Sequence, residues 1–192
     1  MRKMKTVLTF ALLVMMTGFG FAQQKNQPGS WRFQSINSVG LLEGQAGSAF
    51  QLQTVNGARY FSWFAGIGVG LDNYRLRTIP IFLDVRKEFG NSSNKFFVYA
   101  DAGISFSWIP DNEKMPYTQE HFSNGFYDDF GFGYKAALGK KNALQVSLGY
   151  SYKNLTDTYT YGYYNVDPPT GNPPEKISYY LNRLSIKLGW SF

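Results

Sequence analysis

The last nine residues of the chain constrain its fold more than any other segment. From Leu184 to Phe192 every second residue is apolar, and the residues between are polar or small: Ser185, Lys187, Gly189 and Ser191. A β-strand turns successive side chains to opposite faces, so one face of this segment is entirely apolar. In a membrane barrel, lipid covers such a face and terminal aromatic residues lie at the interface. The segment therefore predicts the last strand of a membrane-spanning barrel.

The first 22 residues have the three parts of a secretory signal peptide. Basic residues at positions 2, 3 and 5 precede the apolar run Val7 to Met16, and Gly20-Phe21-Ala22 places small residues before Gln23. A membrane helix anchoring a soluble domain is the alternative, but the run is too short and no charged stop follows it. We expect a signal peptide over 1–22, a short mature segment over 23–31 and one barrel domain over 32–192.

Charge and composition exclude several classes of function. Without the three basic residues of the signal, 16 of the 19 basic residues remain against 13 acidic ones. That small excess does not indicate nucleic-acid binding. The chain has no cysteine and one histidine, which excludes disulfides, thiolate metal sites and histidine-based metal clusters. We expect no metal, no cofactor and no nucleic-acid partner.

Alternation of apolar and polar residues recurs along the mature chain. Besides the terminal strand, the clear cases are 62–72, 77–86, 96–108, 126–138 and 143–155. Two weaker candidates are 33–43, where a bulge at 39–42 would reset the register, and 48–55. An even number of strands suits a closed barrel, and the 20 glycines, 14 tyrosines and 17 phenylalanines suit alternating strands around a wet interior. The predicted fold is all-β: an eight-stranded antiparallel up-and-down transmembrane β-barrel.

Short and long connections between the predicted strands alternate along the chain. Asn56-Gly57, Gly90 to Lys95 and Gly139 to Asn142 are rich in turn-forming residues and would lie on the periplasmic side. Residues 109–124 and 156–178 form long connections on the opposite, extracellular side. Outer-membrane barrels have this arrangement of short periplasmic turns and long extracellular loops.

The polar face of the strands carries charges of both signs. Side chains fill the interior of an eight-stranded barrel, and solitary buried charges are costly. We therefore expect a hydrogen-bonded ion network in the lumen, with Gln51, Gln53 and Tyr99 beside Asp84, Arg86, Asp101, Asp129, Lys135, Lys153, Arg183 and Lys187. Because five of these residues are basic and three acidic, a narrow anion-selective or small-solute channel is the alternative.

Aromatic residues gather where the strands would leave the membrane. Tyr and Trp suit headgroup depth because each has an apolar body and a polar tip. We predict anchoring on the periplasmic side by Trp63, Phe96, Trp190 and Phe192, and on the extracellular side by Tyr74, Trp108, Tyr150, Tyr152, Tyr179 and Tyr180.

One short string has the residues of a hydrolytic site. His121 and Ser123 are two apart and would share a strand face, so the imidazole could reach the hydroxyl. Together with Asn124 they resemble the His-x-Ser-Asn string of the outer-membrane lipid A deacylases (the PagL family), which are also small barrels. The string departs from that family in two respects. Lys135 occupies the position of the expected acidic residue, and the string opens the sixth strand instead of lying near the C-terminus.

The signal peptide, the eight segments and the terminal Trp190-Ser191-Phe192 resemble the small outer-membrane β-barrel proteins of Bacteroidota, with the architecture of the OmpA membrane domain and OmpX-like barrels. The resemblance implies location in the cell outer membrane. It also implies contact with outer-membrane lipid and lipopolysaccharide, and recognition of the C-terminal strand by the barrel-assembly machinery.

The long connections carry the leading hypothesis for function. We expect a non-enzymatic structural or surface-interacting protein that acts through 109–124 and 156–178. Thr158 to Tyr164 could extend the second hairpin beyond the membrane, and exposed tyrosines are good contact residues for an extracellular ligand that the sequence does not identify. A tall rigid loop without a partner is equally compatible. The alternatives are a lipid-modifying enzyme using His121 and Ser123, and a channel.

Overall fold

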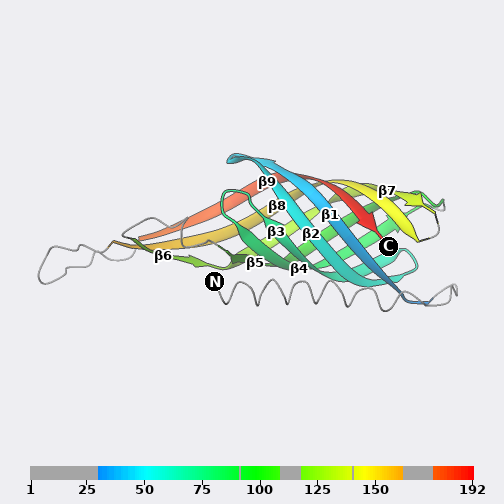
Figure 1. The fold of residues 1–192 in the computed structure, drawn as a ribbon, viewed down its shortest axis with the longest axis horizontal. Helices are drawn as coiled ribbons and strands as arrows, with labels where there is room; N and C mark the ends of the chain where they lie inside the picture. Colours follow the sequence, from blue (N-terminus) through cyan, green and yellow to red (C-terminus); the bar gives the residue numbers. More distant parts are fainter. Residues whose placement is uncertain (1–29, 91, 109–117, 140, 162–174) are drawn as a thin grey trace, which may run out of the picture.

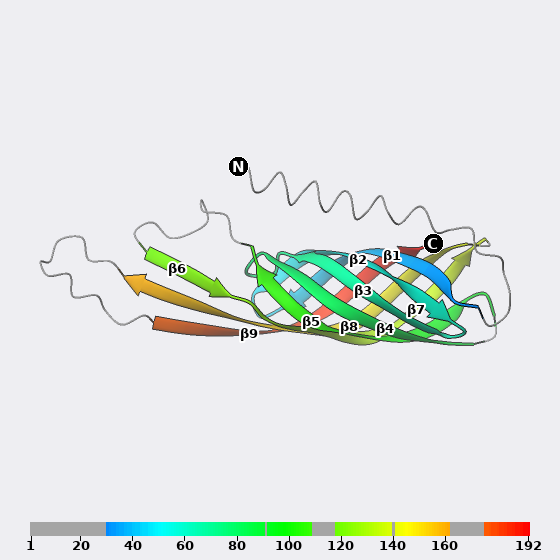
Figure 2. The same cartoon turned by 90° about the horizontal axis from the view of Figure 1, so that it is seen from below.

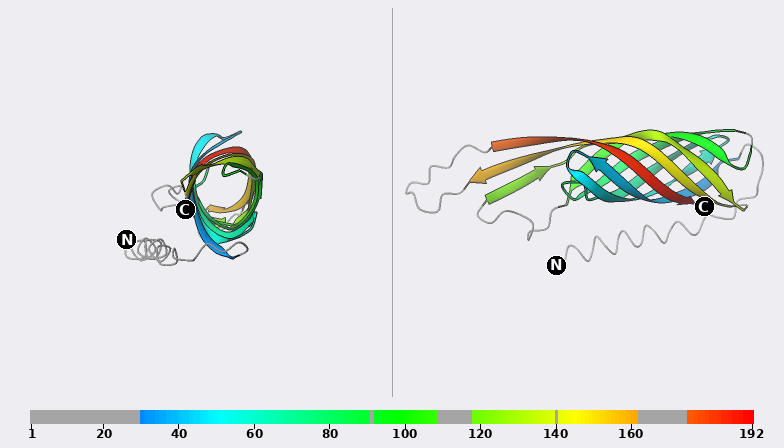
Figure 3. Two further views of the ribbon diagram at one scale, coloured as in Figure 1. Left: turned by 90° about the vertical axis from the view of Figure 1, so that its right-hand side faces the viewer. Right: turned by 90° about the horizontal axis from the view of Figure 1, so that it is seen from above.

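The protein is a closed antiparallel β-barrel in the computed structural model, which describes residues 30–90, 92–108, 118–139, 141–161 and 175–192. These residues form nine strands: β1 (Arg32–Gly44), β2 (Gly47–Tyr60), β3 (Trp63–Asp72), β4 (Thr78–Phe89), β5 (Lys95–Ser107), β6 (Thr118–Ser123), β7 (Gly125–Leu138), β8 (Asn142–Tyr161) and β9 (Glu175–Ser191). All except β6 form the barrel, which closes because β9 pairs with both β1 and β8. Figures 1 and 3 show the tilted strands and the ring that they enclose. The predicted eight-stranded barrel is confirmed.

The predicted signal peptide and most of the segment 23–31 lie outside the described residues. Within the described part of the chain, no helix is both long and apolar enough to cross a membrane.

Apolar side chains cover the outside of the barrel wall. Val146 and Leu188 are register partners on β8 and β9, and they are 53% and 52% exposed. Ile67, Leu83 and Phe132, on three other strands, are exposed as well. Contiguous apolar surface of this extent needs a cover, and around a closed barrel that cover is lipid.

The pairing of β1 contradicts the bulge predicted at residues 39–42. β1 pairs one-to-one with β2 along its whole length, and its pairing with β9 is equally regular. The polarity pattern breaks because Ile36 and Leu42 are apolar but point into the lumen, where each joins a buried apolar cluster. Part of the lumen is therefore apolar, and polarity alone predicts the wrong face for these two residues.

One of the three predicted periplasmic turns is also wrong. Asn56-Gly57 lies within β2, which needs its full length to pair with both neighbours, and the chain turns at Phe61-Ser62. Gly57 has a different role, because a Cβ there would lie 2.2 Å from the carbonyl oxygen of Ala65 on β3. The other two turns are confirmed, with Gly90 and Gly139 at φ of 107° and 81°.

Three strands continue beyond the extracellular end of the barrel. Gly44, the last residue of β1, pairs with Arg183, so residues 175–182 of β9 extend past this rim together with the second half of β8. β6 pairs with residues 156–161 of β8. Figures 1 and 2 show the resulting projecting sheet. At the usual rise of about 3.3 Å per residue, residues 175–182 of β9 span about 25 Å. The predicted long connections are thus partly paired strands, and 109–117 and 162–174 lie outside the described residues.

Candidate functional site

Three aspartates lie side by side in the middle of the lumen. Asp84, Asp101 and Asp129 are register partners on β4, β5 and β7, and all three are buried. Lys187 on β9 reaches two of them, with Nζ 3.1 Å from Asp129 Oδ2 and 3.6 Å from Asp101 Oδ2. Like charges on opposed residues repel each other, and Lys187 offsets part of that repulsion at Asp101 and Asp129.

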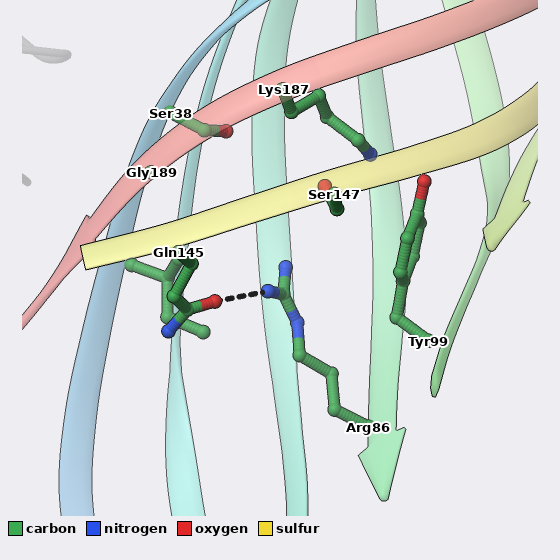
Figure 4. A pocket seen from close by; sticks show the side chains of 8 residues that line it. Ser38, Arg86, Tyr99, Gln145, Ser147, Lys187 and Gly189 are labelled. Atoms are coloured by element: carbon green, nitrogen blue, oxygen red, sulfur yellow. Dashed lines mark hydrogen bonds between the residues drawn. The ribbon is translucent and has the colours of Figure 1, made fainter. Parts of the chain in front are cut away.

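Arg86 neutralises the third aspartate. Its guanidinium donates to both oxygens of Asp84 at 2.6 to 2.9 Å, and Nη1 donates to Gln145 Oε1 at 2.9 Å. The Tyr99 hydroxyl donates to Asp129 at 2.7 Å. Figure 4 shows Arg86, Gln145, Tyr99 and Lys187 around a small cavity of about 10 Å³. That volume has room for about one water molecule.

A second ion cluster fills the extracellular half of the lumen. The carboxylate of Asp72 accepts a hydrogen bond from Arg183, and Lys153 Nζ lies 3.1 Å from Asp72 Oδ2. Arg183 also donates to Ser151 Oγ at 2.6 Å, and Lys153 donates to Thr78 Oγ1 at 3.1 Å. All five side chains are buried. Such additional bonds offset part of the cost of removing the charges from water.

Tyr74 closes the extracellular mouth above this cluster. Its ring packs against Leu42 and Leu181, and its hydroxyl accepts a hydrogen bond from the Ala46 backbone N–H at 2.7 Å. The residue is 1% exposed, so the prediction of an interfacial anchor at Tyr74 is wrong. The connection between β3 and β4 folds into the mouth instead of standing away from it, and the backbone N–H of Tyr74 donates to Asp72 Oδ1 at 2.8 Å.

An aromatic layer separates the two ion clusters. The rings of Phe82 and Tyr127 lie 5.4 Å apart inside the barrel. The Tyr127 hydroxyl accepts hydrogen bonds from Gln51 and Gln53 at 3.1 and 2.8 Å. Gly68 leaves the space that the Phe82 ring occupies, since a Cβ there would lie 2.3 Å from Phe82 Cε2. The lumen is thus filled in successive layers.

A third cluster lies at the periplasmic end around Glu88. Lys135 donates to Glu88 Oε1 at 2.8 Å, Lys95 Nζ lies 3.5 Å from Oε2, and Arg59 donates to the same oxygen. Sequence reasoning placed Lys135 in the lumen but missed Glu88 and Arg59. Both strands were predicted too short, at 77–86 and 48–55, and continuing the same alternation by a few residues would have found both side chains.

Most of the predicted interface aromatics are exposed on the outside: Trp63, Phe96, Trp108, Tyr150, Tyr180, Trp190 and Phe192. Tyr152 and Tyr179 are half-buried, and Tyr179 packs against the cluster around Tyr74. Several have polar or charged neighbours: Lys87 Nζ lies 4.5 Å from the Trp63 ring centroid, and the Tyr150 hydroxyl donates to Asn182 at 2.7 Å. An apolar ring with a polar neighbour suits headgroup depth.

The candidate catalytic residues lie at the start of the projecting sheet. His121 and Ser123 belong to β6, a strand separate from the sixth barrel strand β7, so the expectation that they open the sixth barrel strand is wrong. The Ser123 hydroxyl donates to the Thr156 carbonyl oxygen at 3.0 Å, and Asn124 is exposed between β6 and β7. The His121 side chain lies outside the described residues. Asp129, one of the nearest acids in sequence, is committed to the lumen network.

Comparisons with known proteins identify the fold. No protein-family model matches the chain. No curated protein matches it either. Among solved structures it is similar to Neisserial surface protein A (NspA), with 14% identity, a TM-score of 0.51, and coverage of 86% of this chain and 98% of that one. It is also similar to the outer membrane protein OprG from Pseudomonas aeruginosa, with 10% identity, a TM-score of 0.53, and coverage of 88% and 98%.

The closed wall, its apolar belt and its filled lumen define the class of protein. The chain is a small integral β-barrel protein of the outer membrane, built on the same eight-stranded fold as these two structures.

Proposed function

We propose that this barrel is a non-enzymatic structural or surface-interaction protein that acts through its projecting sheet. The observation that carries the proposal is the continuation of β8 and β9 as a paired hairpin past the rim, joined by β6. This part of the chain holds exposed side chains such as Lys176, Ile177 and Tyr180 above the membrane. Rigid strands present contact residues with little loss of entropy on binding, which favours recognition of an extracellular ligand.

The filled lumen favours this role over transport. The ion cluster around Asp101, the aromatic layer, the ion cluster around Asp72 and Tyr74 follow one another along the axis. A conducting pathway would have to displace buried ion pairs, which is costly. In planar bilayers we expect no stable unit conductance, and a reproducible ion-selective conductance would favour the channel alternative.

A trimmed barrel tests the proposed role. Thr156 and Ser178 are register partners whose hydroxyls lie 3.2 Å apart, so a two-residue Asn-Gly turn can join them in place of residues 157–177 and remove the outer part of the projection. We expect this variant to insert into the membrane and to show heat-modifiable gel migration. In cells that lack the protein, it should not restore the surface property that is lost with the protein. The removed residues 157–177 hold three acidic residues and one basic residue, so the charge-matched control is Asp167→Asn/Glu175→Gln in the full chain. Full restoration by the trimmed barrel would contradict the proposal.

A lipid A deacylase-like enzyme is the second candidate. It is favoured by the placement of His121 and Ser123 two residues apart on one strand, close to the outer leaflet. Mass spectrometry of lipid A from cells with and without the protein tests it. Deacylation that disappears in Ser123→Ala would establish the enzyme, whereas unchanged lipid A in cells with the intact protein would remove this candidate.

We also propose which group of small barrels the chain belongs to and which partners it contacts. We place the chain with the OmpA- and OmpX-like small barrels of Bacteroidota, on the basis of its signal-like start and its aromatic terminal strand. Lipopolysaccharide would contact the aromatic outer girdle, and the barrel-assembly machinery would recognise β9.

A further inference from the structure

The periplasmic end of the lumen carries two pairs of like charges in direct register. Arg32 on β1 is the register partner of Arg59 on β2, and Lys95 on β5 is the partner of Lys135 on β7. Like charges directly opposite each other on neighbouring strands are destabilising. Four cations therefore gather at one mouth of the barrel, and the repulsion within each of the two pairs lowers the stability of the fold.

One carboxylate side chain offsets only part of this charge. Glu88 contacts Lys135 at 2.8 Å, Lys95 at 3.5 Å and Arg59. Its two oxygens thus serve three bases, and Arg32 adds a fourth cation at the exposed rim. At neutral pH the five side chains carry a formal net charge of +3.

These cations remain accessible from the periplasmic side. The side chains of Arg59 and Lys95 are 23% and 25% exposed, so their donor groups are not sealed inside the wall. The cluster continues inward, because Gln145 is the register partner of Lys135 and accepts the hydrogen bond from Arg86 seen in Figure 4. The mouth is therefore a basic, partly exposed surface that leads to the filled centre of the lumen.

We propose that this periplasmic mouth, formed by Arg32, Arg59, Lys95 and Lys135, binds a phosphate group. A phosphate dianion has the charge and the acceptor oxygens to bridge donors that come from four strands, whereas one carboxylate would leave most of the excess charge unmatched. Arginine guanidinium groups bind phosphate in a bidentate manner, and lysine ammonium groups bind it as point charges. Bound phosphate also relieves the repulsion within the two like-charge pairs. The site is independent of the role proposed for the projecting sheet, which lies at the opposite end.

Calorimetric titration of inorganic phosphate into the folded barrel tests the site. The protein is held at low ionic strength in an uncharged maltoside detergent, since salt would screen the interaction. We expect saturable binding that Arg32→Gln/Lys95→Gln weakens by about tenfold or more, because two charge-assisted bonds are lost. The matched control is Arg75→Gln/Lys176→Gln, which removes the same charge at the extracellular end and leaves the affinity unchanged.

Glu88→Gln gives the sharper test, because its expected effect has the opposite sign. Removing the competing carboxylate increases the net charge of the mouth and frees donors, so phosphate should bind several-fold more tightly. A purely structural cluster predicts no such gain. Heat-modifiable migration confirms that each variant is folded before its affinity is measured.

The phosphate group could belong to an anionic lipid headgroup or to a soluble periplasmic compound, and nanodiscs of two lipid compositions distinguish these sources. Loss of phosphate binding in phosphatidylglycerol discs, with binding kept in phosphatidylcholine discs, assigns the site to an anionic lipid headgroup of the inner leaflet. Binding kept in both assigns it to a soluble periplasmic phosphate compound. The proposal is overturned if phosphate does not bind saturably in maltoside, if Arg32→Gln/Lys95→Gln binds as the wild type does, or if Glu88→Gln leaves binding unchanged or weakens it.

Discussion

Asp72 and Arg183 are 111 residues apart in the chain and form a buried ion pair inside the extracellular half of the barrel. Lys153 joins the same carboxylate from a third strand. Because β3, β8 and β9 each contribute one member, the cluster ties together strands that are not all neighbours in the wall. The cluster is a cross-brace in the sense that its side chains link β3 to β8 and β9 through the lumen, a link that neither the backbone pairing nor the lipid-facing belt makes.

Asp72→Asn should destabilise the barrel strongly. The substitution leaves Lys153 and Arg183 as adjacent buried cations without a counter-charge, and breaking a buried pair in this way costs about 3–5 kcal/mol. Equilibrium unfolding in urea, with the protein in lipid vesicles, measures the loss. Adding Lys153→Met should recover part of it by removing one unpaired charge. A cost as small as that of the exposed control Glu175→Gln would show that the brace contributes little.

Removing Tyr74 should weaken the barrel without opening a channel. Tyr74→Phe loses the bond to the Ala46 N–H and should cost about 1 kcal/mol, whereas Tyr74→Ala also leaves a cavity beside Leu42 and should cost about 3–5 kcal/mol. Vesicle unfolding measures both, with the exposed Tyr180→Ala as control. Planar bilayers should still show no conductance, because Phe82 and the ion clusters below remain. A stable conductance in Tyr74→Ala would mean that this residue is the gate of a pathway.

Much of the barrel follows from period-two alternation, because lipid and lumen impose opposite polarity on neighbouring residues. The alternation places Leu188 outside and Lys187 inside without any knowledge of contacts. It fails at Ile36, which is apolar yet points inward, since the interior of a small barrel tolerates an apolar layer. Asn56-Gly57 misleads for a related reason: a strong local turn signal yields to the length that β2 needs for pairing with its neighbours.

The ion partners inside the lumen could be predicted as a set but not as pairs. Which carboxylate Lys187 contacts depends on the stagger of β9 against strands far away in sequence. The spacing of residues along the chain does not indicate this stagger. The buried position of Tyr74 could not be predicted for another reason. Its side chain lies in a connection rather than a strand, so no alternation indicates that it folds into the mouth.

Gly68→Ala should be destabilising through one specific ring. The new Cβ would lie 2.3 Å from Phe82 Cε2 in a filled lumen, and overpacking of this kind costs about 1–3 kcal/mol. The matched control is Gly189→Ala, where the nearest atom is 3.5 Å away and little change is expected. In a Phe82→Leu background the cost of Gly68→Ala should shrink. An undiminished cost in that background would locate the strain in the backbone and not at the ring.

Leu188→Arg tests whether lipid covers the outer wall. Leu188 and its partner Val146 lie in the apolar belt, so a guanidinium at Leu188 would be placed in hydrocarbon at a cost of about 2–4 kcal/mol near the bilayer midplane. Tyr180→Arg places the same group on the exposed projecting sheet and should stay within about 0.5 kcal/mol of the wild type. Unfolding in vesicles measures both, and thicker bilayers should not reduce the cost at Leu188. Equal costs at the two positions would mean that water, not lipid, surrounds the belt, and the assignment to the membrane would fail.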